Sequence, residues 1–312
     1  MLIPLRHENM KGRRWPVITI GLIVLNTLIF LGTHGTIEEQ QTPRNTEARV
    51  RILMLAAMHP GLNMPGEVQE FVTTFEKGDP ATWKVLQNPN RDVEDAWDAH
   101  MRMMGEPQDW QREMDTLAAQ FVENKEVSLV QRYAFVPAHP RAISRLSANF
   151  LHAGWLHLIG NMWFLWLAGF ILEDTWGRPL YLVFYLLSGV IALQVHAWSN
   201  PQSLVPTLGA SGAVAALMGA FLVRFPKMKI EMAWIFGVFR MYRFKAAAYW
   251  LLPLWVLMEI FSGTVFGRSS GVAHWAHVGG FLSGALFGLV IRESGLESMA
   301  EQHIQEIGRA HV

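Results

Sequence analysis

The composition of this 312-residue chain is that of a membrane protein rather than of a soluble domain. Hydrophobic residues make up 51% of the sequence and charged residues only 17%, whereas a soluble domain carries roughly 25% charged residues. The formal net charge is zero, so the charge balance gives no indication of a nucleic-acid partner. The chain has no cysteine, which excludes disulfides, thiolate zinc sites and cysteine-protease chemistry.

Five apolar segments are long enough to cross a bilayer as helices, for which about 20 residues are needed. They cover residues 15–33, 150–172, 180–198, 246–266 and 272–291. A sixth apolar segment, residues 208–223, is shorter and rich in glycine and alanine, and we expect it to begin below the outer membrane surface, among its neighbours. The sequence therefore predicts an all-α membrane protein with a bundle of six transmembrane helices.

Lysine and arginine gather in alternate short connections, and this bias sets the orientation of the spans. They lie in the N-terminal tail (residues 1–14), at Arg178 after the second span, between residues 224 and 245, and in the C-terminal tail (residues 293–312). The pattern predicts a multi-pass protein with both termini in the cytoplasm, which we assign to a bacterial plasma membrane. The insert of residues 34–145 would then lie outside, followed by a core of five spans at 146–292.

The insert has the periodicity of a folded helical domain. Helices are predicted at residues 45–58, with Asn45 as a cap, and at 106–126, with a further helical stretch around 92–104. A small helical domain resting on the outer membrane face is the simpler interpretation. A module that selects substrates is the alternative.

Four polar residues within the spans are candidates for chemistry, because ionisable or strongly polar groups are costly in a membrane. His157 and Asn161 lie four residues apart and so share a helix face. Hydrogen bonding between helices is the other explanation for that pair. Ser211 begins the short span, where free backbone N–H groups favour developing negative charge. His277 precedes two glycines, which would let a neighbouring helix approach closely. Together the four supply a nucleophile, a base and oxyanion donors for acyl transfer.

Other catalytic sites fit the sequence less well. There is no H-E-x-x-H motif, and Ala213 breaks the G-x-S-x-G motif of the α/β-hydrolases. His152, His157, His274 and His277 could gather near the outer face, but the sequence places no carboxylate or thiolate beside them. We therefore expect neither a metal nor a cofactor.

At these residues the chain resembles the rhomboid intramembrane serine proteases, from about residue 133 to 291. Four motifs carry the resemblance, in the order in which the family has them: FLHAGWLHLIGNM at 150–162, YLLSG at 185–189, GASG at 209–212 and AHVGG at 276–280. The resemblance implies that Ser211 is the nucleophile and His277 the general base, without an acidic third member. It also implies an oxyanion site formed by His157, Asn161 and the Ser211 backbone N–H.

The resemblance further implies a six-helix core with a water-filled cavity open to the outer side, and substrates that are membrane-spanning helices. It leaves the oligomeric state open. Two positions depart from the family pattern. Ala215 stands where some members stack an aromatic ring on the base, and Thr175 stands near Glu173 where some have an arginine, so that an ion pair is expected to be lost. A catalytically silent relative that binds or escorts membrane proteins is the alternative function. A channel or transporter is disfavoured because no inverted repeat is evident.

Overall fold

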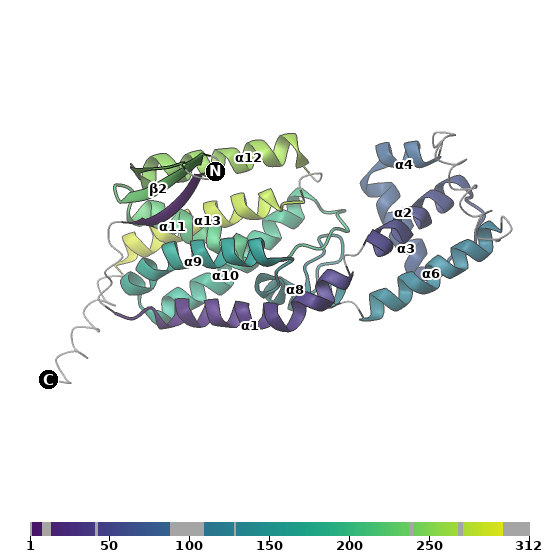
Figure 1. The fold of residues 1–312 in the computed structure, drawn as a ribbon, viewed down its shortest axis with the longest axis horizontal. Helices are drawn as coiled ribbons and strands as arrows, with labels where there is room; N and C mark the ends of the chain where they lie inside the picture. The colour runs from purple at the N-terminus through teal and green to yellow at the C-terminus, as the bar shows by residue number, and fades with distance from the viewer. Residues whose placement is uncertain are drawn as a thin grey trace.

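The computed structural model describes residues 2–7, 14–40, 43–87, 109–127, 129–236, 240–267 and 271–295. The apolar helices lie in the bundle on the left of Figure 1; among the described residues, five are long and apolar enough to span a membrane and one is shorter. The five are α1 (Val17–Gln40), α9 (Trp155–Trp176), α10 (Arg178–Ser199), α12 (Ala248–Val265) and α13 (His274–Ser294). The sixth, α11 (Ser211–Arg224), is shorter, as predicted. The largely helical fold predicted from hydropathy is confirmed.

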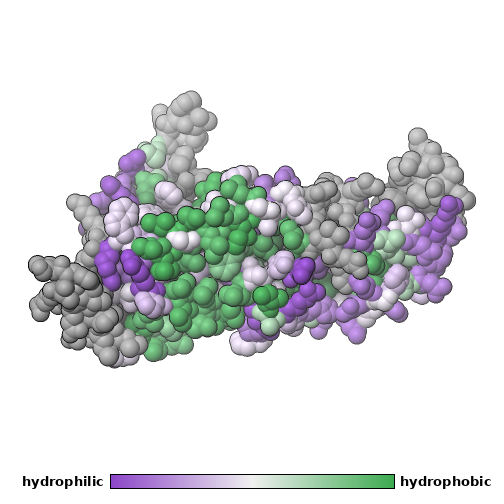
Figure 2. Space-filling model, turned by 90° about the horizontal axis from the view of Figure 1, so that it is seen from below, coloured by the Kyte–Doolittle hydropathy of each residue, from purple (hydrophilic) through white to green (hydrophobic). Residues whose placement is uncertain are grey.

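The bundle carries an apolar band around its middle. Figure 2 shows a continuous hydrophobic surface across the bundle, with hydrophilic residues beyond it on both sides. Large side chains such as Leu28, Leu257 and Phe261 are each about 60% exposed. An apolar surface of this extent is unfavourable in water and matches the hydrocarbon layer of a bilayer.

Helices α11 and α13 pack against each other at the centre of the bundle. A methyl group added at Gly280 would collide with the carbonyl oxygen of Gly212, and one added at Gly284 would collide with that of Ala216. Glycine at these positions therefore lets the two backbones touch, as at other small-residue interfaces in membranes. This close approach brings the start of α11 beside the start of α13.

Helix α1 extends about two turns beyond the predicted end at residue 33, to Gln40. Its added turns bury Ile37 against Val130, Ala134 and Leu151, which belong to the segment that leads back into the bundle. This packing explains why the helix continues through residues that are too polar for a membrane span. At the other end, α9 begins at Trp155, five residues later than expected, after a 3₁₀ turn at Ala148–Phe150.

The start of α1 is held by Glu173 near the end of α9. The Glu173 carboxylate accepts hydrogen bonds from the backbone N–H groups of Ile18 and Thr19, at 2.9 and 2.7 Å. Arg178 lies 3.9 Å from the same carboxylate. Thr175 stands where an arginine would supply an ion pair, but Arg178 gives Glu173 an ionic partner instead. The expectation that the ion pair is lost was therefore wrong. A carboxylate at this helix terminus also complements the free N–H groups and the dipole.

A three-stranded antiparallel sheet at the end of the bundle remote from the insert was not predicted. It consists of β1 (Leu2–His7), β2 (Lys229–Phe236) and β3 (Arg240–Ala247), in the order β1-β2-β3. Strand β1 is more than 200 residues away in sequence from β2, so only the tertiary structure could show that the two strands pair. A salt bridge of 2.8 Å between Arg6 and Glu231 joins β1 to β2. The sheet covers an apolar cavity of about 290 Å³ that lies between α9, α11 and α12.

The insert lies beyond the opposite end of the bundle, on the right of Figure 1. Its helices are α2 (Pro43–Met58), α3 (Gly66–Gly78), α4 (Pro80–Gln87) and α6 (Trp110–Val127), followed by α7 (Leu129–Tyr133) and α8 (Ala142–Ser147). The helices α2, α3, α4 and α6 enclose their own hydrophobic core, which includes Leu55, Val68 and Met114. The helix predicted at 45–58 begins two residues earlier, at Pro43, and the one predicted at 106–126 begins at Trp110. The helical stretch predicted around 92–104 lies outside the described residues.

Candidate active site

Ser211 and His277 meet at the end of the bundle that faces the insert. The Ser211 hydroxyl lies 2.8 Å from the His277 Nε2 atom, within hydrogen-bond distance. Ser211 is the first residue of α11, and His277 lies in the first turn of α13. Because glycines bring these two helices together, residues 66 positions apart form a contact between a hydroxyl and an imidazole nitrogen. Such a pair can act as a nucleophile and its general base.

The chain enters α11 through a backbone conformation that only a residue without Cβ adopts easily. Gly209 has a φ of +122°, and its N–H donates a hydrogen bond of 2.8 Å to the carbonyl oxygen of Ala148. The first i→i+4 hydrogen bond of the helix runs from Val214 N–H to the Ala210 carbonyl oxygen. The N–H of Ser211 therefore stands at a helix N-terminus, where backbone donors are available to an anion.

His157 and Asn161 face this turn from α9. A methyl group at Gly209 would lie 2.6 Å from His157 Nε2 and 3.7 Å from Asn161 Nδ2. Asn161 is only 6% exposed, and within the described part of the chain its Nδ2 has no hydrogen-bond partner. A buried amide donor without a partner is costly, so an unpaired Asn161 amide near Ser211 indicates a functional role.

His152 lies behind His157 and is fully buried in the loop before α9. The ring centroids of the two histidines are 5.2 Å apart, at an interplanar angle of 68°. Burial, together with the proximity of His157, lowers the pKa of His152 to about 4. His152 is therefore neutral near neutral pH and adds no positive charge beside His157.

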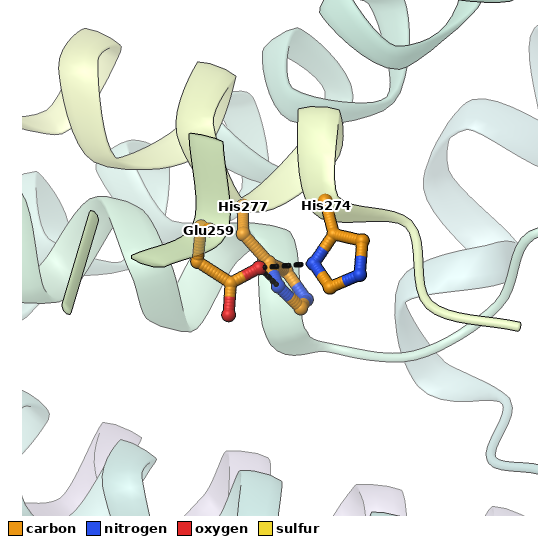
Figure 3. A group of neighbouring side chains, drawn as sticks. All are labelled: Glu259, His274 and His277. Atoms are coloured by element: carbon orange, nitrogen blue, oxygen red, sulfur yellow. Dashed lines mark hydrogen bonds and ion pairs between the residues drawn. The ribbon is translucent and has the colours of Figure 1, made fainter. Parts of the chain in front are cut away.

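A carboxylate completes the group of polar side chains, as Figure 3 shows. Glu259 on α12 places Oε2 2.8 Å from Nδ1 of His277 and 2.7 Å from Nδ1 of His274. The serine and both histidines line a cavity of about 640 Å³, together with His157 and His196. The polar residues of four helices thus converge on one chamber at the insert side of the bundle.

Comparison with known families decides the assignment. Residues 140–294, about half of the chain, match the Rhomboid domain. The matched region contains all four motifs quoted above. The chain belongs to the rhomboid family. The resemblance inferred from the sequence is thereby confirmed, and so is a multi-pass membrane protein.

Curated relatives support the family and differ in length from this chain. Rhomboid-like protein 11, chloroplastic, of Arabidopsis thaliana is 32% identical over 186 residues, which are 56% of this chain and 59% of the relative. Rhomboid-like protease 5 of Toxoplasma gondii is 31% identical over 140 residues, 45% of this chain and 15% of that protein. Presenilin-associated rhomboid-like protein A, mitochondrial, of Danio rerio is 28% identical over 162 residues, or 51% and 40%.

This rhomboid therefore spans less than two thirds of each of these relatives. All three come from eukaryotes, and the names of two place those proteins in chloroplasts or mitochondria. The relatives thus give no support to the bacterial plasma membrane expected from the sequence.

Glu259 is the residue of this site that sequence reasoning missed. The family resemblance implied a serine–histidine pair without an acidic third member, whereas the structure places a carboxylate on the far nitrogen of His277. A signal was present in the sequence, because Glu259 is the only charged residue in α12. A lone ionisable residue in an apolar span is a functional candidate by default.

At the position of Ala215, some rhomboids have an aromatic residue that stacks on the base. In this chain the ring of His277 has a different aromatic neighbour. Trp255 on α12 has its ring centroid 6.1 Å from that of His277, at an angle of 33°. Trp255 and Glu259 are four residues apart on α12 and so lie on the same face. Helix α12, the fourth of the five long helices, therefore lies beside the His277 ring.

The four-histidine metal group considered from the sequence divides into two parts. His152 and His157 contact each other, while His274 and His277 share Glu259. The second group could offer three ligand atoms to a cation. Its N···O distances of 2.7 and 2.8 Å are those of hydrogen bonds, shorter than the roughly 3.3 Å between ligands around a tetrahedral zinc ion. The described geometry thus fits a hydrogen-bonded network better than a metal site.

Proposed function

We propose that this rhomboid is a serine endopeptidase that cleaves membrane-spanning proteins near the outer membrane face. The observation that carries the proposal is the 2.8 Å contact between Ser211 Oγ and His277 Nε2 at the N-terminus of α11. It stands in a chamber that four histidines help to line, inside a bundle whose outer surface is apolar. Burying a hydroxyl, an imidazole and an unpaired donor together would destabilise a purely structural core, because each polar group is costly to bury.

Acyl transfer follows from this arrangement. The Ser211 Oγ–H gives its proton to His277 Nε2 while Oγ bonds to the carbonyl carbon of the scissile peptide. The negative charge then on the carbonyl oxygen is stabilised by the Ser211 N–H, the Asn161 side chain and His157. His277 returns the proton to the departing amine, and the peptide C–N bond breaks to leave an acyl-enzyme. A water molecule, deprotonated by the same imidazole, releases the acyl group and restores Ser211.

The chamber lies at the level at which α11 and α13 begin, so a peptide must reach it as an extended segment. Peptide bonds in a helix have their carbonyl groups hydrogen-bonded and shielded, and a substrate helix must unwind before attack. Small or helix-breaking residues near the scissile bond would favour this. The partners we propose are therefore membrane-spanning proteins, with the lipid bilayer as the medium and no cofactor.

A catalytically silent protein that binds membrane clients is the second candidate. It is disfavoured by the complete serine–histidine pair and by the unpaired Asn161 donor, which such a protein would have no reason to keep. The orientation, with both termini cytoplasmic and the insert outside, is a prediction from the charge bias.

The decisive experiment compares the purified wild type with Ser211→Ala in detergent. Cleavage of a transmembrane substrate and labelling by a fluorophosphonate probe should both disappear in the variant, while its melting temperature stays near that of the wild type. Ser211→Ala removes one oxygen atom from a tightly packed helix start, so little destabilisation is expected. Turnover retained by the variant, or absent from a folded wild type, would refute the proposal.

A further inference from the structure

We propose that Glu259 is a positioning residue that orients the His277 base and stabilises its protonated form, which makes the site a triad in this chain. This inference rests on the proposed function. The geometry on which it stands is a continuous relay across α12, α13 and α11. Glu259 Oε2 lies 2.8 Å from His277 Nδ1, and His277 Nε2 lies 2.8 Å from Ser211 Oγ.

The carboxylate decides which nitrogen of the imidazole carries a proton. An ionised carboxylate only accepts hydrogen bonds, so the proton of a neutral His277 resides on Nδ1, which donates to Glu259. Nε2 is then free of hydrogen and can accept the Ser211 proton. After that transfer both nitrogens carry protons, and the positive ring faces the negative carboxylate. Glu259 itself takes up no proton in this scheme.

The position of Glu259 in the helix argues for such a role. It is the only charged residue of α12 and its side chain is 16% exposed, so the charge is placed within an apolar span. Neighbours on α13 compensate it. The His274 Nδ1 group donates a second hydrogen bond of 2.7 Å to the same oxygen. His157 and His196, on α9 and α10, line the same chamber and, within the part of the chain that the structure describes, are the other titratable groups that line it.

The surroundings of the ring explain why this chain would use a carboxylate. Ala215, one turn after Ser211, has no aromatic ring to stack on the imidazole, whereas α12 places Trp255 near the ring and Glu259 beside its Nδ1. A hydrogen bond from Nδ1 fixes the direction in which both ring nitrogens of His277 point, whereas stacking on an aromatic ring leaves the imidazole free to rotate in its own plane. Helix α12 thus holds the Nδ1 side of the His277 ring, while Ser211 on α11 contacts its Nε2.

A structural pin between α12 and α13 is the simpler role for Glu259, and the test separates the two. Glu259→Gln keeps the size of the side chain and removes its charge. Glu259→Asp keeps the charge on a shorter side chain. Glu173→Gln is the matched control, because Glu173 is a second buried carboxylate whose hydrogen bonds hold the start of α1, away from the base.

Each variant is purified by gel filtration, and kcat and KM for a transmembrane substrate are measured from roughly pH 5 to pH 9, the range in which imidazoles titrate. The rate of fluorophosphonate labelling is measured on the same samples, with and without a chelator. We expect Glu259→Gln to lower kcat and the labelling rate at least about 100-fold with KM changed less than about threefold. The acid limb of the pH profile should move to lower pH, because a neutral amide no longer favours the protonated ring.

Glu259→Asp should recover part of the lost kcat and keep the pH profile of the wild type, and Glu173→Gln should lower the melting temperature with an unchanged pH profile. The proposal is overturned if Glu259→Gln keeps kcat within about threefold of the wild type. It is also overturned if the loss of activity is accompanied by a loss of stability while the pH profile stays that of the wild type. If Glu259→Gln does not fold, the aspartate variant decides: a wild-type pH profile and a partial loss of kcat support the proposal, and a shifted profile contradicts it.

Two further outcomes have a definite meaning. Loss of activity on adding the chelator would replace the hydrogen-bonded role by a metal site at Glu259, His274 and His277. The Ser211→Ala sample is run in parallel, so that the two proposals can fail separately. If Ser211→Ala is inactive and Glu259→Gln is fully active, only the role of Glu259 is wrong. If Ser211→Ala retains turnover, the proposed function itself is wrong.

Discussion

Gly209, in the turn before Ser211, permits a sharp test of the proposed oxyanion site. The substitution Gly209→Ala adds one methyl group at a φ of +122°, beside the His157 ring. The added carbon would lie 2.6 Å from His157 Nε2 and 2.7 Å from its Cε1. We expect the variant to fold, with a lower stability, and to lose most of its turnover.

The magnitude follows from the distances. An ordinary contact between such atoms is about 3.5 Å, so the ring must move by roughly 0.9 Å. A misplacement of about 1 Å at a catalytic group costs on the order of 100-fold in rate, and so does the loss of one oxyanion donor. A fall in kcat of at least about 100-fold is therefore expected, equivalent to about 2.7 kcal/mol of transition-state stabilisation. The unfavourable backbone conformation adds about 1–3 kcal/mol of destabilisation to the folded state.

Gly177→Ala provides the matched control. Gly177 also has a positive φ, of +79°, but a methyl group there would meet nothing within 4 Å, and the residue joins α9 to α10 at the other end of the bundle. It should lose stability of the same order and keep the kcat of the wild type. The assay is the cleavage of a transmembrane substrate in detergent, with thermal unfolding of each sample. If kcat of Gly209→Ala is within about threefold of that of Gly177→Ala, His157 does not act at the place that the geometry indicates.

Three other expectations follow from the same structure. Asn161→Ala should lower kcat by about 100- to 1,000-fold with KM changed far less, because its unpaired amide acts only on the oxyanion; unchanged turnover would leave Asn161 as a bond between helices. Protease added to sealed, right-side-out cells should cut a tag placed near Asn90 and spare one at Val312; the reverse pattern would invert the predicted orientation. Replacing residues 43–126 by a flexible linker, with Ile37 kept because it is buried against the bundle, should preserve fluorophosphonate labelling of Ser211 and lower the processing of a membrane substrate. Loss of labelling in a folded deletion variant would show that the insert supports the catalytic geometry.

The sequence by itself determined the spans, because each helix that crosses a membrane must satisfy its backbone hydrogen bonds internally and be apolar along its length. The same rule marked Ser211, His277, His157 and Asn161, since polar groups are too costly in a span to occur without a reason. These features are local. They can be read from single segments without knowing which segments lie side by side.

Only the tertiary structure decided the features that depend on contacts between distant segments. The polar turns at the end of α1 are helical because Ile37 packs on residues nearly 100 positions later. β1 becomes a strand because β2 lies beside it. Glu259 could have been noticed as a lone charge, but its partner could not, because the distance from its carboxylate to His277 depends on how α12 and α13 cross. Hydropathy is enough to predict that a segment forms a helix. Which helices contact each other depends on side-chain packing between segments, and no single segment contains that information.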